Sequence, residues 1–377
     1  MTEWRECKLK DVCKYERISI NPQKYKILQF VHYSFPAFDN NKTPEIQFGG
    51  QIKSSKYIVK KGYILYNKLN VRFKRIWNIN FETPENSICS SEFLPILATK
   101  CNQDYLYYFL CSDELTDTMA NSNTGTSGSH QRIDPNFLMK YDILLPPLPE
   151  QKAIAEVLSS LDDKIDLLTR QNKTLEDLAQ AYFRKWFIED IHNKICYKRF
   201  ADVAEFSKGK KPREIIEEQR KGYVRQILID TFDTDKEYYT RPEGMIISTE
   251  TDILMVMDGA SSGRVEIGFS GVVGSTIGMF RPKSDFKYPM FLYEFLKSNE
   301  EFIMDNTTGS AIPHADKKLI FELEIPYFQE EKIQEFENFA LVLFNKRQNN
   351  RRQIRTLTKL RDTLLPKLIS GEIRVKM

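Results

Sequence analysis

Apolar side chains recur every three or four residues between Leu145 and Phe187. This spacing makes one continuous stripe along a helix, and it is typical of a coiled-coil seam. The run LPPLPEQ stands at its start, where prolines cannot continue a preceding helix and a glutamate suits the dipole of the first turn. A helix of this length needs a partner, because it has too little interior to form a domain. The predicted seam residues are Ile154, Leu158, Leu161, Ile165, Leu168, Leu175, Tyr182 and Trp186, with polar Asn172 on the same register.

A second stretch, from Ile325 to Ile373, repeats this pattern and supplies the partner. We expect Pro366 to stop or kink the second helix and Ser370-Gly371 to close it. Because Arg347, Asn350 and Arg361 interrupt the stripe, the seam is expected to be looser there or to face polar groups. An ordinary amphipathic helix lying on a core is the alternative for both stretches. The predicted seam residues of this helix are Ile333, Phe336, Leu343, Ile354, Leu357 and Leu364.

The chain contains an internal duplication. A polar, glycine-containing loop followed by a histidine occurs in both halves at the same spacing, with His130 in the first half and His314 in the second. An aromatic segment recurs as well, as Tyr105–Leu110 and again as Phe291–Leu296. The sequence therefore predicts one unit written twice, each copy being a globular domain followed by a long helix.

Each copy is expected to mix strands and helices. Short apolar runs predict strands at Lys56–Asn67, Ser90–Leu97 and Ile143–Leu145, and at Asp252–Met257, Val272–Phe280 and Glu322–Ile325, with short helices at Asp104–Cys111 and Pro289–Ser298. The predicted fold class is α+β: two similar mixed α/β domains, separated by two long helices that form an antiparallel coiled coil, in a pseudo-twofold internal duplication. The expected boundaries are 1–147 for the first domain, 148–193 for the first long helix, 194–327 for the second domain and 328–377 for the second long helix.

Composition narrows the range of functions. At 377 residues, with 41% hydrophobic and 28% charged residues, the chain is long enough for two well-cored units. The net charge of +3 gives no global basic field, so contacts to nucleic acid must come from local clusters. Six cysteines without CxxC or metal-ligand spacing fit a reducing cytoplasm, and no metal site is expected. The N-terminus lacks an apolar signal-peptide core and no run approaches membrane-spanning length, so we expect a cytoplasmic protein.

The sequence carries no catalytic signature: Walker A, GxGxxG opening a helix, HExxH and GxSxG are all absent. The glycine-rich stretch Asp258–Arg264 is not followed by a P-loop lysine and helix, which favours a turn that approaches DNA or caps a sheet. Asp162–Lys164 and Glu330–Lys332 resemble the acidic-x-Lys triplets of metal-dependent nucleases. Such a site needs a further acidic residue across a sheet, and both triplets lie on predicted heptad helices. No catalytic residue and no metal ligand is therefore predicted.

Local basic clusters are the better candidates for a functional surface. Lys208–Arg213 places four cations around a glycine and a proline, and Lys68–Arg75 interleaves cations with an aromatic residue. Cations suit phosphate contacts, while Asn, Gln and Arg side chains can hydrogen-bond to base edges. A solubilising surface is the alternative for any single residue. The predicted DNA-binding residues are Asn67, Lys68, Asn70, Arg72, Gln131, Arg132, Lys208, Lys210, Lys211, Arg213, Arg264 and His314.

The two helical regions resemble conserved regions of a known family. LPPLPEQKAIAEVLSSLDDKIDLL followed by LEDLAQAYFRKWF is similar to the central conserved region of the specificity (S) subunits of type I restriction–modification systems. RDTLLPKLISGEI is similar to their distal conserved end. The loop leading into Arg132-Ile133, and then Leu145–Leu148, resembles the usual close of a target recognition domain. The second copy departs from this pattern, since IPYFQEE replaces the fuller proline-rich EQ signature.

The resemblance implies a non-catalytic subunit. Each globular domain would be a target recognition domain that binds one half of a bipartite double-stranded DNA target. The helices would set the spacer and dock two methyltransferase (M) subunits, and through them the motor/nuclease (R) subunits. This chain would bind no cofactor. S-adenosylmethionine for adenine-N6 methylation, ATP and Mg²⁺ are expected in the partner subunits, and no membrane partner is implied.

The predicted seam has a length suited to that role. From Ile154 to Trp186 it would span roughly 48 Å at 1.5 Å per residue, against about 34 Å for one duplex turn. Three alternatives remain. One is the S-type subunit of a type IIB-like system, in which modification and cleavage share one partner chain. Another is a coiled-coil scaffold with two protein-binding domains. The last is an independent methyltransferase, for which the chain lacks both a cofactor loop and an Asn/Asp-Pro-Pro-aromatic motif.

Overall fold

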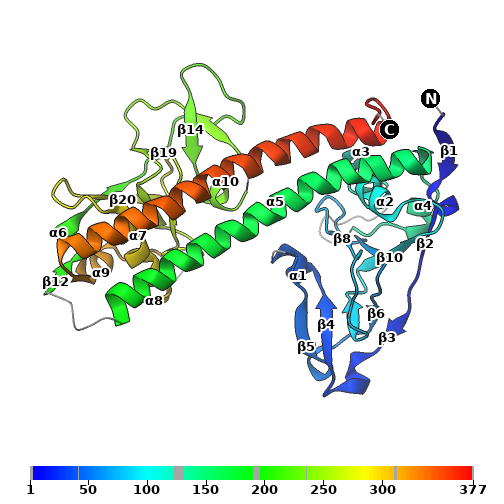
Figure 1. The fold of residues 1–377 in the computed structure, drawn as a ribbon, viewed down its shortest axis with the longest axis horizontal. Coiled ribbons are helices and arrows are strands. Elements are labelled where there is room, and N and C mark those ends of the chain that lie inside the picture. The colour runs from blue at the N-terminus through cyan, green and yellow to red at the C-terminus, as the bar shows by residue number, and fades with distance from the viewer. Residues whose placement is uncertain are drawn as a thin grey trace. The chain divides into compact units, whose positions relative to one another are not determined.

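The computed structural model describes residues 3–40, 42–122, 131–189, 196–234, 236–309 and 312–375 (Figure 1). The chain divides into two compact units. Unit 1 combines Met1–Ile165 with Thr356–Met377, and unit 2 is the continuous segment Asp166–Arg355. The breaks at residues 165 and 355 fall inside the two long helices. Each unit therefore contains one part of each long helix.

The described part of unit 1 is built on three sheets. Their strand orders are β2-β10-β7-β8, β3-β6-β9-β4-β5 and the two-stranded β1-β11. Within the five-stranded sheet, β4 and β9 run parallel and the other neighbours antiparallel. The strands are β1 Arg5–Lys8, β2 Cys13–Tyr15, β3 Ser19–Ile20, β4 Gln29–Tyr33, β5 Glu45–Phe48, β6 Lys56–Ile58, β7 Tyr63–Asn67, β8 Ile76–Asn78, β9 Ser87–Cys89, β10 Phe93–Ala98 and β11 Asp142–Leu145.

Short helices cover the sheets of unit 1. Side chains of Asn102 and Asp134 accept hydrogen bonds from backbone N–H groups in the first turns of α2 and α4, which satisfies donors that a helix start leaves unpaired. The helices are α1 Phe35–Asp39, α2 Gln103–Leu110, α3 Asp113–Asn121 and α4 Pro135–Met139, with 3-10 turns at Leu9–Asp11, Pro22–Tyr25 and Gly49–Gln51.

Unit 2 repeats this plan. Its described sheets have the orders β13-β20-β17-β18, β15-β14-β19-β16 and β12-β21. The strands are β12 Cys196–Arg199, β13 Ala204–Lys208, β14 Val224–Ile227, β15 Tyr238–Thr240, β16 Ile247–Ser248, β17 Ile253–Val256, β18 Val265–Ile267, β19 Gly271–Val273, β20 Ile277–Pro282 and β21 Glu324–Tyr327. The helices are α6 Phe200–Val203, α7 Pro289–Ser298, α8 Glu300–Asp305 and α9 Lys317–Glu322, with a 3-10 turn at Ile229–Phe232.

The two units share one topology. Strands β2, β10, β7 and β8 correspond in order to β13, β20, β17 and β18, and β1-β11 corresponds to β12-β21. The remaining sheets also agree: β4 pairs parallel with β9 and antiparallel with β5, as β14 does with β19 and β15. Only β3, at the edge of the first unit's sheet, has no counterpart among the described strands. The predicted fold class, a duplicated α+β domain, is confirmed.

Two predicted strands are each two strands of different sheets. The run Lys56–Asn67 is broken at Gly62, whose φ of +93° only glycine adopts readily, so β6 and β7 join different sheets. The run Val272–Phe280 is likewise divided into β19 and β20. The predicted strand at Ser90–Leu97 is β10, which begins three residues later at Phe93. Apolar runs showed where chain is buried, but they did not show which sheet it enters.

The two long helices are α5, Leu148–Phe183, and α10, Glu330–Ser370. A π-helical turn, Arg184–Glu189, continues α5. Pro366 lies inside α10, so it does not stop the helix; that it kinks the helix stays a prediction. The expected closure at Ser370-Gly371 is confirmed, because Gly371 takes a left-handed φ of +78° just after the last helical residue.

In unit 1 the beginning of α5 packs with the end of α10. Ile154, Leu158, Leu368 and Ile369 belong to one buried cluster, which also contains the apolar face of α2. Both ends of the chain meet here (Figure 1). Trp4 Nε1 donates to Glu150 Oε2 at 3.1 Å, and the Arg374 guanidinium forms an ion pair with the same carboxylate. These residues tie the N-terminal strand region and the segment after α10 to the first turn of α5.

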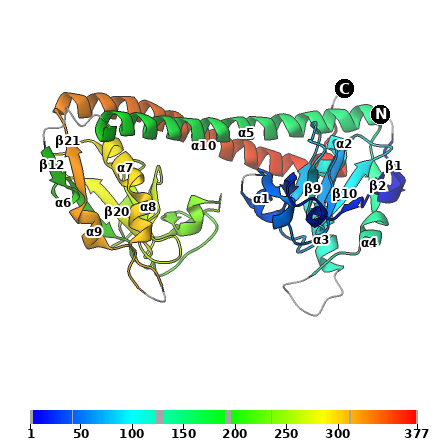
Figure 2. The same ribbon diagram turned by 90° about the horizontal axis from the view of Figure 1, so that it is seen from below.

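In unit 2 the end of α5 packs with the beginning of α10, so the helices run antiparallel. Helix α7 lies between them and the sheet that contains β20 (Figure 2). The buried residues here include Ala179, Phe183 and Phe187 of the α5 region with Ile333, Phe336 and Ala340 of α10. The predicted seam residue Tyr182 is 38% exposed, while its neighbour Phe183 is 1% exposed. Tyr182 nevertheless faces the partner helix, because its ring lies 4.7 Å from the Phe339 ring of α10.

The other predicted seam residues lie at graded depths. Ile154, Leu158, Leu168, Ile333 and Phe336 are buried. Leu161, Ile165, Leu175, Trp186, Leu343, Ile354, Leu357 and Leu364 are half-buried.

Polar residues of the seam meet polar partners, as the interrupted stripe predicted. Asn350 is fully buried, and its Nδ2 donates to Gln171 Oε1 at 2.8 Å and to Asn172 Oδ1 at 3.0 Å. In unit 1, Arg361 pairs with Asp162 at 2.8 Å. The Asn350 amide nitrogen and the Arg361 guanidinium thus recover hydrogen bonds that they lose on leaving water.

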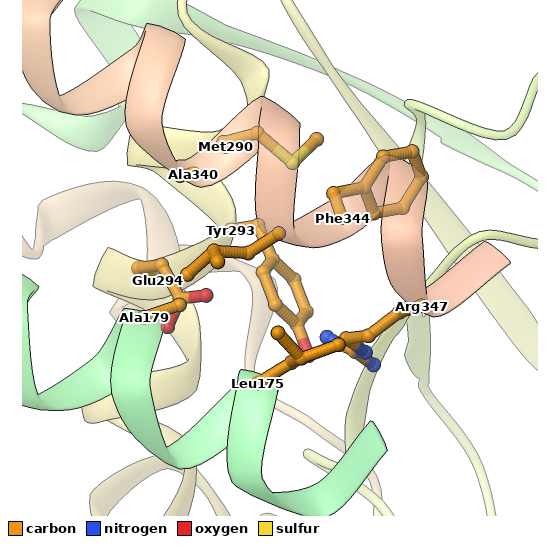
Figure 3. A pocket seen from close by; sticks show the side chains of 9 residues that line it. Leu175, Ala179, Met290, Tyr293, Glu294, Ala340, Phe344 and Arg347 are labelled. Carbon is orange, nitrogen blue, oxygen red and sulfur yellow. The ribbon is translucent and has the colours of Figure 1, made fainter. Parts of the chain in front are cut away.

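A small enclosed space in unit 2 separates α7 from the long helices (Figure 3). Tyr293 and Glu294 of α7 point into it, facing Leu175 and Ala179 of α5 and Phe344 and Arg347 of α10. Burial raises the pKa of Glu294 to about 8, although the Arg347 guanidinium acts in the opposite direction. Its walls are mainly apolar side chains, so the space belongs to the packing of α7 against the long helices.

Candidate nucleic-acid interface

The loop after β7 is shaped by the buried side chain of Asn67. Asn67 is 1% exposed. Its Nδ2 donates to the carbonyls of Leu69 and Phe73 at 3.1 and 3.0 Å, and its Oδ1 accepts from the Arg75 N–H at 3.2 Å. An amide that is buried and engaged with backbone cannot reach a base edge. The prediction that Asn67 contacts DNA is therefore wrong, and its role is to hold the loop.

Backbone hydrogen bonds bring four other predicted residues together in unit 1. The Asn70 N–H donates to the Gln131 carbonyl at 3.0 Å, and the Ile133 N–H donates to the Lys68 carbonyl at 3.0 Å. Leu69 and Arg132 form an isolated antiparallel bridge between these bonds. Lys68, Asn70, Gln131 and Arg132 are thus neighbours although far apart in sequence. Arg72 is exposed in the same loop, after Asn70, which has a positive φ of 50°.

Arg132 is the centre of a charged cluster at this place. Its Nε and Nη2 donate to the two carboxylate oxygens of Glu92 at 3.0 and 2.8 Å, and this hydrogen bonding lowers the pKa of Glu92. Lys68 lies beside them: burial lowers its pKa, and the positive charges of Arg17 and Arg132 lower it further. We call Arg17, Lys68, Glu92 and Arg132 the Arg132 cluster. Arg132 and Lys68 both lower the pKa of the Glu92 carboxyl, and Arg17 lies close enough to Lys68 to lower the pKa of that amine.

A second charged cluster lies in unit 2. Lys208 Nζ is 2.9 Å from Asp258 Oδ2, and His314 Nδ1 is 2.8 Å from Asp258 Oδ1. Burial alone would raise the pKa of Asp258, but hydrogen bonds from Lys208 and His314 outweigh it and lower the pKa. We call Lys208, Asp258 and His314 the His314 cluster.

Glycine positions the basic segment that contains Lys208. A Cβ on Gly209 would lie 2.1 Å from the carbonyl oxygen of Gly274 and 2.6 Å from that of Val273, so no other residue fits without moving backbone. This close approach sets the directions of the flanking lysines. Lys210 Nζ donates to the Gly244 carbonyl at 3.1 Å. Lys211 and Arg213 follow as exposed residues.

Arg264 binds side chains of its own unit. It pairs with Asp233 and with Glu266, each at 2.8 Å, and its guanidinium lies over the Phe232 ring. The hydrogen bond that Arg264 donates to Asp233 is the largest cause that raises the pKa of Arg264. Because both carboxylates hold the guanidinium, the prediction that Arg264 reads DNA is not supported by its contacts.

The predicted equivalence of His130 and His314 is wrong, and His130 itself lies outside the described residues. His314 bridges Asp258 as Arg132 bridges Leu69. The flanking bonds also match, since Ala315 N donates to the Met257 carbonyl as Ile133 N does to that of Lys68. The counterpart of His314 is therefore Arg132, two residues beyond His130. Aspartates that cap the following short helices, Asp134 and Asp316, are a sequence signal that could have revealed this alignment.

Sequence reasoning also missed three members of the clusters: Arg17, Glu92 and Asp258. Arg17 follows β2 as Lys208 ends β13, because Tyr15 pairs with Ile96 of β10 and Phe206 pairs with Phe280 of β20. These pairings place Arg17 and Lys208 at corresponding positions. The carboxylates carry no local motif, and only the folded structure shows them beside their cations.

Comparison with known proteins assigns the family. The model of the type I restriction modification DNA specificity domain matches residues 1–177 and again 193–350. The chain therefore belongs to the family of type I restriction–modification specificity subunits, and the duplication corresponds to two such domains.

Particular relatives agree with this assignment. The chain is 27% identical to the type I restriction enzyme MjaIX specificity subunit of Methanocaldococcus jannaschii, over 72% of this chain and 69% of the relative. It is 23% identical to the HindI specificity subunit of Haemophilus influenzae, over 99% of this chain and 100% of the relative. The crystal structure of a type I S subunit from M. genitalium has the same fold, with a TM-score of 0.64 and 17% identity over 97% of this chain and 96% of that one.

The described residues form neither a metal site nor a membrane-spanning helix. No group of three or more His, Cys, Asp and Glu side chains there could hold a metal ion. None of the described helices combines the length and the apolar character needed to cross a membrane.

Proposed function

We propose that this chain is the DNA sequence-recognition subunit of a type I restriction–modification complex and has no catalytic role of its own. Each unit's domain binds one half of a bipartite double-stranded DNA target. The single observation that carries the proposal is the repetition of one strand order in two units that both match the specificity-domain model. Two like modules suit a target with two halves, and they present like surfaces to two identical partners.

The long helices are the proposed docking elements. In this scheme α5 and α10 bind two methyltransferase subunits, which use S-adenosylmethionine to methylate adenine at N6. The motor/nuclease subunits, with ATP and Mg²⁺, join through them. The length of the paired helices sets the spacer between the half-targets. In support, α5 has 36 residues and α10 has 41, which at 1.5 Å per residue is about 54 and 62 Å.

The test is reconstitution with the methyltransferase subunits encoded beside this chain. Methylated adenines are first mapped in host DNA. Binding of the purified complex to duplexes that carry the mapped motif is then measured at 0.15 M salt, because non-specific binding weakens with salt. The complex is expected to prefer the mapped motif over other sequences by about 10³-fold or more. Equal binding of all split sequences would contradict the proposal. A partner that carries modification and cleavage in one polypeptide would favour the type IIB-like alternative. If the chain is instead a coiled-coil scaffold with two protein-binding domains, the purified complex would not bind these duplexes.

A further inference from the structure

The Arg132 and His314 clusters occupy the same place in the two units. Arg17 and Lys208 stand at corresponding positions after paired strands. Arg132 and His314 each come two residues before an aspartate that caps a short helix. Matching backbone bonds surround each of them. The shared topology therefore places a basic residue at the end of a paired strand, Arg17 or Lys208, and a basic residue of the late loop, Arg132 or His314, at corresponding positions in the two units.

The remaining members of the clusters are not copies of one another. Glu92 precedes β10, whereas Asp258 follows β17. Lys68 is replaced in unit 2 by Met257, which is 4% exposed. The residue types also differ, since arginine stands where the other unit has histidine, and another arginine where it has lysine. Both units nevertheless arrive at basic side chains held by a single carboxylate.

Stability does not account for these clusters. The side chains of Arg132, Lys208 and His314 are 54%, 49% and 48% exposed. Exposed ion pairs contribute no more than about 1 kcal/mol. Cations that remain half in solvent can exchange a carboxylate for another anion at little cost, and the carboxylate holds each cation in a fixed orientation until then.

The shared position indicates which part of DNA is contacted. The two domains of a bipartite reader must recognise different base sequences, so residues that read base edges are expected to differ in place as well as in kind. Phosphates are common to every half-target, and phosphate contacts fix register without carrying sequence information. A cation site preserved in position but not in residue type fits a phosphate.

We propose that the Arg132 cluster and the His314 cluster are equivalent DNA-phosphate sites, one for each half-target. This inference rests on the proposed function. On binding, a phosphate oxygen takes the place of the Glu92 or Asp258 carboxylate as partner of Arg132, or of Lys208 and His314. Each contact releases about one condensed counterion, so each site contributes about 0.9 to the slope of log Kd against log salt.

The experiment uses the complex with its methyltransferase subunits and duplexes carrying the mapped target. Arg132→Gln and Lys208→Gln are compared with matched controls, Lys61→Gln and Arg199→Gln. The controls remove exposed cations that also pair with a carboxylate, Lys61 with Glu82 at 2.6 Å in unit 1 and Arg199 with Asp202 at 3.1 Å in unit 2. Binding is measured from 0.05 to 0.5 M salt, a range over which the slope is well defined. Unfolding temperatures check that every variant is folded.

Each cluster variant is expected to lower the salt slope by about 0.9 and to weaken binding about five-fold at 0.15 M salt. The loss should be the same on the intact target and on targets altered in either half. His314→Arg should retain the wild-type slope or exceed it. The controls should leave both quantities unchanged.

An unchanged slope in Arg132→Gln and Lys208→Gln would overturn the inference. So would a loss confined to particular base pairs, because that is the signature of base reading. Failure of the proposed function looks different: the wild-type complex itself would then not distinguish the mapped target from other split sequences.

Discussion

The two units attach the long helices in different ways. In unit 1, charged groups bind the beginning of α5 and the end of α10, whereas in unit 2 aromatic rings pack against the end of α5 and the beginning of α10. Glu150 is 1% exposed and binds both Trp4 and Arg374. Asp162 accepts from Tyr108 and Arg361, each at 2.8 Å. In unit 2, Phe183, Phe187, Phe291, Phe328 and Phe336 form a cluster with ring centroids from 4.9 to 6.4 Å apart.

Unit 2 also holds α10 with a row of arginines. Arg351 donates to the Ile267 carbonyl at 3.0 Å, Arg352 pairs with Glu250 at 2.9 Å, and Arg355 lies 3.5 Å from Glu237. The strand order is thus the same in both units, whereas the side-chain contacts to the long helices α5 and α10 differ between them. A duplicated fold keeps its hydrogen-bonded sheets, because register changes would turn whole faces over. Side-chain contacts to a helix can be replaced one at a time.

The largest expected effect concerns the aromatic end of the seam. Phe183→Ala should destabilise unit 2 by about 3–5 kcal/mol, because a buried ring is lost and a cavity remains. Tyr182→Ala, one residue earlier and 38% exposed, should cost no more than about 1 kcal/mol. Denaturant unfolding of the two variants measures the difference. Equal losses would mean that the contact of Tyr182 with Phe339 stabilises the seam as much as the buried Phe183 ring does.

The next effect tests the helices as a spacer. One heptad is inserted after Ile165 in α5 and one after Arg355 in α10, at the boundaries of the units. Seven residues add about 10 Å, or roughly three base pairs at about 34 Å per turn. Affinity for the original target should fall about 100-fold, with recovery on a target whose spacer is three base pairs longer. Insertion in α5 alone is the control, and it should reduce stability because the seam is mismatched. New half-sequences in the methylation map would refute the idea.

Opposite pH dependences should distinguish the two units. In unit 2, burial raises the pKa of Glu294 from 4.5 to about 8 and that of Glu337 from 4.5 to about 7. The folded state then holds protons that the unfolded state releases, so stability falls as pH rises from about 4.5 to about 8, by up to about 1.4 kcal/mol per pH unit for each group. Glu294→Gln should flatten this decline, and thermal unfolding between pH 5 and pH 8.5 measures it. An unaltered pH profile would show that Glu294 is charged when folded.

Unit 1 should respond in the other direction. The hydrogen bond from Arg374 lowers the pKa of Glu150 below 4.5. The contribution of the Glu150 carboxylate to the stability of unit 1 is therefore complete above pH 4.5, and it is lost as the pH falls through the pKa of Glu150 in the folded state. Glu150→Gln should remove this acid-side loss while lowering stability at pH 7, where Arg374 is left without its carboxylate. A variant as stable as the wild type at pH 7 would mean that the ion pair contributes nothing to unit 1.

The smallest effect concerns the carboxylates of the clusters. Glu92→Gln frees Arg132 in unit 1, and Asp258→Asn frees Lys208 and His314 in unit 2. Each should raise DNA affinity by about two- to five-fold at 0.15 M salt, since a competing anion is removed (roughly one exposed ion pair). Glu82→Gln, which frees Lys61, is the matched control. Weaker binding by both cluster variants would show that the carboxylates are needed to position the cations.

The long helices were predictable from sequence because their stripes repeat over many turns, and the interrupted positions Asn350 and Arg361 correctly indicated polar partners. The stripe did not show how deeply each residue is buried. Tyr182 contacts only the edge of the seam, at Phe339, and is 38% exposed, whereas Phe183 also packs against Phe291 of α7 and is 1% exposed. The heptad pattern identifies the face of the helix that is covered, but it cannot show that a third helix lies over part of it.

The candidate interface was less predictable, because its members meet only through sheet pairing. Lys68, Arg132, Lys208 and His314 were identified as basic residues near turns, but Asn67 was chosen for its residue type and is buried. Nothing local in the sequence tells a solvated asparagine from one that organises a loop. The alignment of His314 failed because the two loops differ in length by two residues.

The composition of unit 1 from both ends of the chain has a consequence during synthesis. Unit 2 is continuous, so its residues are all available once Arg355 has left the ribosome. Unit 1 contains the first residues of the chain, yet its core includes Leu368 and Ile369. Glu150 can form its ion pair only after Arg374 has been synthesised. The domain translated first is thus the last to complete its core, and until then the apolar side chains that pack with Leu368 and Ile369 are open to contact with other chains or with chaperones.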